Sequence, residues 1–200
     1  MKSLTIRTIA IGGAILLSSL ALAGCTVNLG SSGSNNDSGM MDNGGMMGSN
    51  NSQFSGTDIM FAQMMIVHHQ QAVDMGTLAE TRASSPEVKK LAAQIKSEQS
   101  PEITQMKGWL KTANAPMEMG HDMGMGGLLT DAQMTALKNA SGAEFDRLYL
   151  EGMIGHHEGA IQMAQMVTES NNAEAKALGN AIITSQTKQI AYMKELLAKM

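Results

Sequence analysis

Two pairs of adjacent histidines are the residues of this sequence best suited to chemistry. His68-His69 and His156-His157 each have a methionine three residues before the first histidine and another seven residues after it. The four methionines are Met65, Met75, Met153 and Met163. A neutral imidazole is the commonest metal ligand in proteins, and imidazole combined with thioether suits a soft monovalent ion such as Cu(I). The pattern predicts a metal site of histidine and methionine ligands.

Between the two pairs, a glycine-rich segment carries a soft ligand at every second position. These residues are Met117, Met119, His121, Met123 and Met125. Methionine accounts for 20 of the 200 residues, and exposed apolar side chains in a loop have no packing role that explains them. We therefore expect this loop to bind Cu(I) or Ag(I) as well. Two alternatives stay open: a low-complexity loop with incidental methionines, and a sacrificial scavenger of oxidants.

The paired histidines also have a purely structural interpretation. In helical projection both members of each pair fall on a broad apolar arc, whereas Gln63, Gln70 and Asp74 fall on the opposite side. Burial of an imidazole without a partner costs free energy, so Gln99, Gln186 or backbone carbonyls would act as hydrogen-bond partners. In that case the protein is a non-catalytic structural or interaction module whose methionines fill the core or absorb oxidants.

Enzymatic chemistry has little support in the sequence. Glu151 and Glu158 fall on the outward side of the helix expected for the second pair, so the inward Glu-x-x-His ligand set of di-iron carboxylate bundles is missing. No nucleophile–base pair, phosphate-binding loop or acidic dyad is found in the sequence. We expect no catalysis and no organic cofactor.

The elements that must position the histidines are duplicated. Residues 58–75 align with residues 146–163, and residues 91–110 align with residues 178–197. Apolar residues recur at spacings of three and four in all four segments, as in amphipathic helices, and no stretch alternates like a strand. The sequence predicts an all-α fold, in which two duplicated helical hairpins form an antiparallel four-helix bundle.

The bundle is expected to occupy residues 55–200. Its expected parts are two repeats at 55–112 and 143–200, a Met-rich loop at 113–129 and a short helix at 130–140. Thr130 and Gln133 resemble a capping box that opens the short helix.

The second helix carries both a start signal and an anomaly. Ser85 followed by Pro86 is typical of a helix start. Pro101 lies inside the same helix, where it removes a backbone donor and clashes with the preceding turn. We therefore expect a kink or a break near Ser97 to Ser100.

The amino terminus has the layout of an export signal. Residues 1–24 carry two basic residues, an apolar run and then small residues, and they end in Leu22-Ala23-Gly24-Cys25, which resembles a bacterial lipoprotein box. Cys25 is then the lipidated residue, and residues 25–54, rich in Gly, Ser, Asn and Met, form a disordered tether. An ordinary signal peptide with an incidental cysteine is the alternative. We expect a lipid-anchored protein of the bacterial cell envelope, outside the cytoplasm.

Charge and composition exclude several classes of partner. The formal net charge is -4, the sequence pI is ≈ 5.7 and aromatic residues make up 3% of the chain. An acidic chain with so few aromatics is unsuited to phosphate backbones, base stacking or anionic lipid headgroups, so we expect no nucleic-acid partner. A single cysteine excludes a disulfide framework and a thiolate metal cluster.

The motifs are residues 61–75, Gln99, Glu102 with Ile103, residues 106–110 and residues 142–163. In these motifs the chain resembles the bacterial domain-of-unknown-function family 305, over roughly residues 55–200. The resemblance implies a ferritin-like four-helix fold, and some members look like exported copper-binding proteins of copper tolerance. By position it implicates as ligands Met65, His68, His69, Met75, Met153, His156, His157 and Met163.

This chain departs from the family pattern at four positions. Val67 and Gly155 stand where many relatives have a proline before the histidine pair. Pro101 and Gln189 also depart, the latter facing Glu102 across the repeat. These changes bear on helix geometry more than on ligand chemistry.

Together, the motifs and the resemblance predict a membrane-tethered protein that sequesters or transfers Cu(I), or Ag(I), in copper tolerance. The expected partners are copper ions, the membrane through the lipid on Cys25, and a copper-transfer protein.

Overall fold

The structure is a computed structural model that describes residues 53–118 and 126–200. All regular secondary structure in these two stretches is helical, which confirms the all-α class, and neither stretch contains a strand. The helices are α1 (Gly56–Arg82), α2 (Pro86–Thr112), α3 (Asp131–Asn139), α4 (Gly142–Ala164) and α5 (Ala173–Leu197), with a 3-10 turn, η1 (Gln165–Val167), after α4. No helix in this part of the chain is long and apolar enough to cross a membrane.

Local capping explains where the helices begin. Ser55 and Thr130 each form a capping box, the second one with Gln133 as predicted. The Ser85 hydroxyl accepts a hydrogen bond from the backbone of α2, and Pro86 occupies the first turn, where its missing N–H costs nothing. Each cap satisfies backbone donors that the first turn of a helix leaves unpaired.

The break predicted near Ser97 to Ser100 is wrong, because α2 runs without interruption from Pro86 to Thr112, whereas the alternative of a kink stays a prediction. Pro101 lies on the exposed side of the helix, so only one backbone donor is lost and the preceding turn faces water. Ile95 and Ile103 on either side of it are both buried in the core. Packing of both halves of the helix therefore outweighs the missing hydrogen bond.

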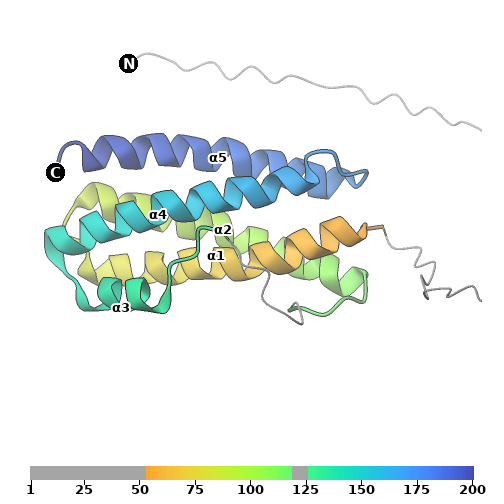
Figure 1. The fold of residues 1–200 in the computed structure, drawn as a ribbon, viewed down its shortest axis with the longest axis horizontal. Helices are drawn as coiled ribbons and strands as arrows, with labels where there is room; N and C mark the ends of the chain where they lie inside the picture. The colour runs from red at the N-terminus through yellow and green to blue at the C-terminus, as the bar shows by residue number, and fades with distance from the viewer. Residues whose placement is uncertain (1–52, 119–125) are drawn as a thin grey trace, which may run out of the picture. The chain divides into compact units, whose positions relative to one another are not determined.

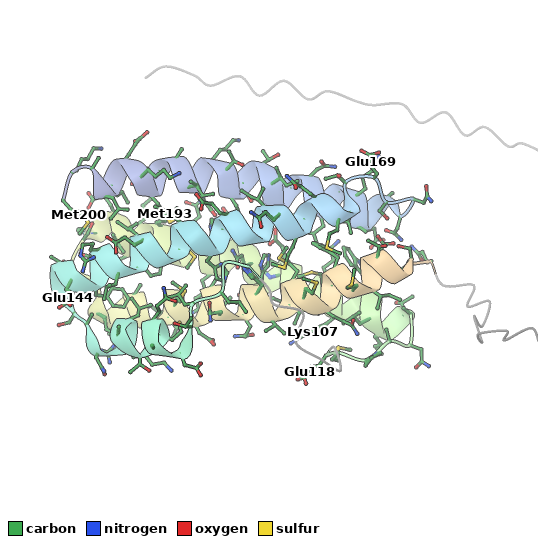
Figure 2. All side chains as sticks on the ribbon, viewed as in Figure 1. Lys107, Glu118, Glu144, Glu169, Met193 and Met200 are labelled. Carbon is green, nitrogen blue, oxygen red and sulfur yellow. The ribbon has the colours of Figure 1, made fainter. Side chains whose placement is uncertain are left out.

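The four long helices lie alongside one another, with α3 against one end of α4 (Figure 1). The closest packing is within the two hairpins, α1 with α2 and α4 with α5, and α1 also packs against α4. Charged side chains such as Lys107, Glu118, Glu144 and Glu169 lie on the outside (Figure 2). This arrangement leaves the apolar side chains of the four helices to form the interior.

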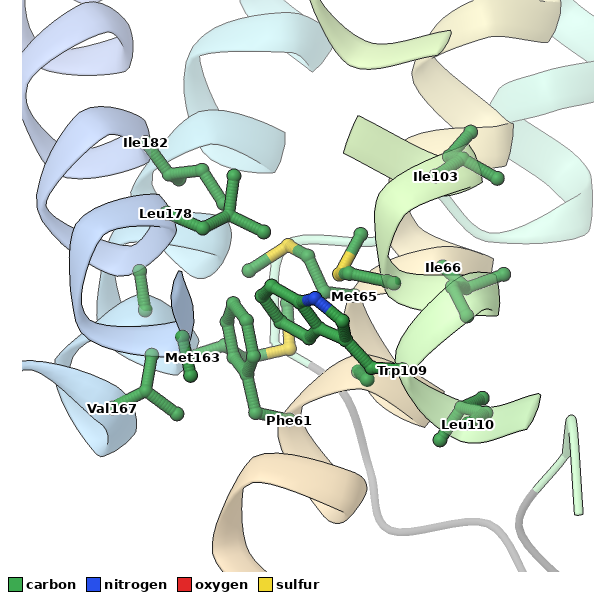
Figure 3. Close-up of a cluster of buried hydrophobic side chains, with 14 of the residues drawn as sticks. Phe61, Met65, Ile66, Ile103, Trp109, Leu110, Met163, Val167, Leu178 and Ile182 are labelled. Carbon is green, nitrogen blue, oxygen red and sulfur yellow. The ribbon is translucent and has the colours of Figure 1, made fainter. Parts of the chain in front are cut away.

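The interior consists of two hydrophobic clusters. The first, which we name the Trp109 cluster, gathers residues from α1, α2, α4, η1 and α5. It includes Phe61, Met65, Ile103, Met106, Trp109, Met163, Val167 and Ile182 (Figure 3). The second, the Tyr149 cluster, lies towards the α3 end. It includes Ala72, Met75, Leu91, Ile95, Leu137, Phe145, Tyr149, Met153 and Met193.

The segment that precedes α3 is held against α4 by glycines. Gly127 has a φ of 87°, and a Cβ atom at Gly159 would lie 2.0 Å from the Gly126 carbonyl oxygen, so neither position accepts a larger residue without movement. The Gln71 amide donates to the Leu129 carbonyl and accepts from the Leu129 N–H, at 3.0 and 2.8 Å. The backbone of this segment is therefore fixed against both α1 and α4.

We predict opposite effects for alanine at two neighbouring glycines of α4. Gly159→Ala should destabilise the protein by about 1–3 kcal/mol, because its Cβ displaces the Gly126 carbonyl. Gly155→Ala should stabilise it by about 0.5–1 kcal/mol, because its Cβ meets no atom within 4 Å and alanine favours the helix. Urea unfolding of both variants measures the difference. Equal stability of Gly159→Ala and the wild type would show that residues 126 and 127 do not rest on α4.

Candidate metal centre

The four paired histidines meet in the interior, as predicted. His68 and His69 come from α1, His156 and His157 come from α4, and none of the four is exposed to solvent. The rings of His68 and His156 lie 3.8 Å apart between centroids, at an interplanar angle of 41°. The rings of His156 and His157 lie 6.2 Å apart. We name these four buried histidines the histidine layer.

Each histidine uses Nε2 in a hydrogen bond to an oxygen atom. His68 Nε2 lies 3.2 Å from the Gly126 carbonyl, and His156 Nε2 lies 2.9 Å from the carbonyl of His68 itself. His69 Nε2 lies 2.8 Å from the carboxylate of Glu102. Carbonyl and carboxylate oxygens only accept hydrogen bonds, so Nε2 is the protonated nitrogen in these three rings.

The fourth histidine has the same tautomer through a relay. His157 Nε2 lies 2.7 Å from Oε1 of Gln189. The amide nitrogen of Gln189 in turn donates to the Glu98 carboxylate at 2.8 Å, which fixes the orientation of the amide and leaves its oxygen for His157. All four Nε2 atoms are therefore donors.

The tautomer of each histidine determines what its other ring nitrogen, Nδ1, can bind. A neutral imidazole protonated on Nε2 carries its lone pair on Nδ1. All four Nδ1 atoms are buried, and none has a hydrogen-bond partner among the described residues. A hydrogen bond from one ring N–H to an oxygen is also how metal-binding histidines are usually oriented for coordination through the other nitrogen. The layer thus presents four uncommitted ligand atoms.

Burial keeps three of these ligands, His68, His156 and His157, neutral. Burial, reinforced by the neighbouring His69, lowers the pKa of His68 to about 3. Burial likewise lowers the pKa of His157 to about 4, although the hydrogen bond to Gln189 opposes the shift. The pKa of His156 is lowered well below its usual value by burial and then by His68. Protons therefore do not compete for these lone pairs near neutral pH.

The structural interpretation is correct only in part. Backbone carbonyls do accept from two of the histidines, as it requires. Gln99 and Gln186 are not the partners: both amide atoms of Gln99 and Oε1 of Gln186 are buried with no hydrogen-bond partner in the part of the chain that the structure describes.

Sequence reasoning missed the role of Glu102 as a partner of His69. Glu102 and Gln189 occupy equivalent positions in the two repeats, and each contacts the second histidine of its own hairpin. The signal was present in the repeat alignment, because equivalent residues in duplicated hairpins have equivalent neighbours. Glu151 and Glu158 are exposed and pair with Arg147 and Lys194, so their predicted outward position is confirmed.

The flanking methionines divide into two pairs. Met65 and Met163 are buried in the Trp109 cluster, near Phe61 and Trp109 (Figure 3). Met75 and Met153 are buried in the Tyr149 cluster. In each cluster, the methionine that precedes one histidine pair lies with the methionine that follows the other pair. Thioethers therefore lie in both of the hydrophobic clusters.

The Met-rich loop is described only at its ends. Met117 is 45% exposed, whereas Met119, His121, Met123 and Met125 lie outside the described residues, as does Cys25. Gln63, expected on the solvent side, is buried, because its amide donates to the Pro116 carbonyl at 2.8 Å. The helical projection failed there because it could not anticipate a loop that covers this side of α1.

Histidine, cysteine and acidic side chains of the described residues do not form a metal site by themselves. Within residues 53–118 and 126–200, no three side chains of His, Cys, Asp or Glu are arranged to hold a metal ion. A metal in the histidine layer has to combine fewer such ligands with another donor class, and thioether sulfur is the donor that the flanking methionines offer. Such a ligand set suits a soft ion of low coordination number.

Known proteins resemble the chain in sequence and in structure. The family described as "Domain of unknown function (DUF305)" matches residues 58–197. A crystal structure of a DUF305 protein from Streptomyces coelicolor, described as secreted, is 35% identical with a TM-score of 0.68, and the match covers 72% of this chain and 91% of that one. The resemblance inferred from the paired histidines is thereby confirmed. No curated protein matches the sequence.

Structures of the protein CopM are also similar. CopM in its Cu(I)-bound form is 34% identical with a TM-score of 0.61, and the match covers 72% of this chain and 98% of CopM. Its Cu(II)-bound form is 37% identical with a TM-score of 0.62, and covers 71% and 96%. CopM has also been solved with silver bound and in an apo form.

We predict that the protein loses stability on mild acidification. The pKa values of His68, His156 and His157 are lower in the folded state than the usual 6.5, so the unfolded chain binds more protons below about pH 6.5. The free energy of unfolding should fall by as much as about 1.4 kcal/mol per pH unit for each of these histidines between pH 6.5 and 4.5. Urea unfolding at a series of pH values measures this slope.

The variant His157→Gln is the control. It removes one of the three buried histidines that take up a proton on unfolding, so the free energy of unfolding should depend on pH less steeply, by the contribution of one proton and no more. A free energy of unfolding that stays constant from pH 6.5 to 4.5 would contradict the burial of the layer.

Proposed function

The chain belongs to the DUF305 family, and on this premise we propose that it binds Cu(I), and Ag(I) in the same way, through the histidine layer. It sequesters the ion or passes it on, and it catalyses no reaction. The observation that carries the proposal is the set of four buried Nδ1 lone pairs, each oriented by a hydrogen bond on the opposite ring nitrogen. The forms of CopM with Cu(I), Cu(II) and silver bound support copper and silver as the metals, and the soft donors support the monovalent state.

A bound ion resolves a problem that a purely structural core leaves. A buried acceptor without a partner costs about 1–3 kcal/mol, and the layer holds four such nitrogens besides the Gln99 amide. Coordination to a cation satisfies a lone pair as a hydrogen bond does. The structural-module alternative has no comparable account of these atoms, so we favour metal binding.

The proposed architecture is an antiparallel four-helix bundle of ferritin-like type. Its support is the pairwise packing of α1 with α2, α4 with α5 and α1 with α4, together with the internal repeat. In this arrangement the second histidine of each pair lies next to the second helix of its own hairpin. The bundle thereby gives each histidine a partner from another segment of the chain.

We further propose a lipid-anchored protein outside the cytoplasm that takes part in copper tolerance. The lipoprotein-like sequence that ends at Cys25 supports the anchor, and the related protein of Streptomyces coelicolor is described as secreted. Residues 25–54 then act as the tether, and the ion is exchanged with a copper-transfer protein. These features stay predictions from the sequence.

We predict that the histidines, not the Met-rich loop, provide the tight site. The variant with alanine at His68, His69, His156 and His157 should bind Cu(I) roughly 100-fold more weakly than the wild type or worse, because the oriented nitrogens are gone. An anaerobic competition titration of the full chain against a chromogenic Cu(I) chelator measures this, with circular dichroism as the check on folding.

The matched control changes Met117, Met119, Met123 and Met125 to serine. It should bind Cu(I) within a few-fold of the wild type. If tight binding instead survives in the histidine variant and disappears in the loop variant, the site lies in the loop and the proposal fails.

We also predict that the flanking methionines contribute thioether ligands. Met65→Leu with Met163→Leu, and Met75→Leu with Met153→Leu, should each weaken Cu(I) binding at least about 10-fold, while leucine preserves volume and stability. The same titration measures the loss. Met106→Leu and Met193→Leu are controls, because both methionines are buried in the same two clusters but do not flank a histidine pair. Wild-type affinity in both double variants would show that sulfur takes no part.

A further inference from the structure

A groove runs between α2 and α5, on the side of the molecule away from the α1–α4 contact. It has a volume of ≈ 760 Å³. Its lining combines apolar and polar groups: Leu91, Gln94 and Glu98 come from α2, and Ala181, Ser185, Lys188, Gln189 and Tyr192 come from α5. The groove exists because the two hairpins meet closely through α1 and α4, whereas α2 and α5 make few direct contacts.

The inner end of the groove is one side chain away from the histidine layer. Gln189 lines the groove and is 6% exposed, and its Oε1 lies 2.7 Å from Nε2 of the fully buried His157. Gln186, one turn before Gln189 on α5, is buried with its Oε1 unpaired. The groove therefore leads towards buried polar atoms that lack partners.

Among residues 53–118 and 126–200, the other pairs of adjacent long helices pack more closely. α1 and α2 pack closely within their hairpin, as do α4 and α5. The seam between α1 and α4 is covered next to His68 by Gly126, whose carbonyl accepts from that histidine and whose backbone touches Gly159. A second groove, of ≈ 650 Å³, lies over α1 and is lined by residues that include Ile66, Val67 and Met117. The partners of the four imidazoles are Gly126, Glu102, His68 and Gln189, and of these only Gln189 lines either groove.

We propose that the α2–α5 groove is the route by which a soft monovalent cation reaches and leaves the histidine layer, with Gln189 as the residue that must move. The inference rests on the proposed function, because it concerns access to the same site. Amide, hydroxyl and carboxylate oxygens along the groove replace part of the hydration of a passing ion. The Glu98 carboxylate and the Lys188 ammonium, one of each charge, leave the lining with no net charge. The contact of Gln189 with His157, not electrostatic attraction, therefore defines the route.

A route residue and a ligand residue have different signatures. Blocking a route slows binding and release by the same factor, because the free and bound states are unchanged, whereas removal of a ligand changes the equilibrium constant. The test measures the rates of Cu(I) transfer from the chromogenic chelator to the full chain and back under anaerobic conditions. The equilibrium constant comes from the same solutions.

The blocking variant is Ser185→Trp, which fills the groove with an indole. We expect both rates to fall at least 10-fold while the equilibrium constant stays within about threefold. Ser185→Ala, which removes the hydroxyl without filling the groove, and Val67→Trp, which fills the second groove on α1, should exchange at the wild-type rate. Wild-type rates in Ser185→Trp, or slow exchange in Val67→Trp, would overturn the proposed route.

A second variant acts in the opposite direction. Glu98→Ala removes the acceptor that holds the Gln189 amide and leaves Oε1 of Gln189 to accept from His157, so both rates should rise at least threefold at an unchanged equilibrium constant; unchanged or slower exchange would count against the route. This variant decides the matter if Ser185→Trp fails to fold. A wild-type chain that takes no Cu(I) from the chelator would remove the proposed function itself, whereas tight binding with unaltered rates in the groove variants removes only the route.

Discussion

Exclusion of water from four imidazoles is the constraint on which the rest of the structure depends. Each Nε2–H needs an acceptor, and the acceptors come from different parts of the chain. His156 takes the carbonyl of His68, a helical carbonyl with a spare lone pair, which fixes how closely α4 approaches α1. His68 takes the carbonyl of Gly126, so the segment before α3 must lie against α4 at Gly159, where only glycine leaves room. The layer thereby dictates the spacing of two helices and the path of a loop.

The two halves of the duplicated fold have diverged where the outer histidines find their acceptors. Glu102 accepts from His69 and ends the chain of hydrogen bonds there. Gln189, at the equivalent position, accepts from His157 and also donates to Glu98 on α2. A carboxylate has no hydrogen to donate, so glutamate at position 189 would break this link and place a second negative charge beside Glu98. The change from acid to amide therefore ties α5 to α2 across a seam with little other packing.

The sequence was sufficient for features that depend on one segment at a time. Helical periodicity, the caps at Ser85 and Thr130 and the burial of the histidines all follow from local patterns, and the structure agrees with them. Features that depend on how segments meet were out of reach. The contact of Glu102 with His69, the covering of Gln63 and the tolerance of Pro101 each need the rotation of one hairpin against its neighbours. The hydrophobic periodicity of one segment does not encode that rotation. The internal repeat indicates only that the two hairpins have equivalent internal arrangements.

The charge of the layer explains why a monovalent ion suits it. The electrostatic cost of burying an ion grows with the square of its charge, so a divalent ion in the same place costs about four times as much. Imidazole and thioether donors are neutral, so they do not offset that cost by attraction between opposite charges. Glu102 is the one carboxylate that touches a histidine of the layer in residues 53–118 and 126–200, and it balances a single positive charge. In the metal site that we propose, one balancing charge and soft neutral donors would favour Cu(I) or Ag(I) over divalent ions.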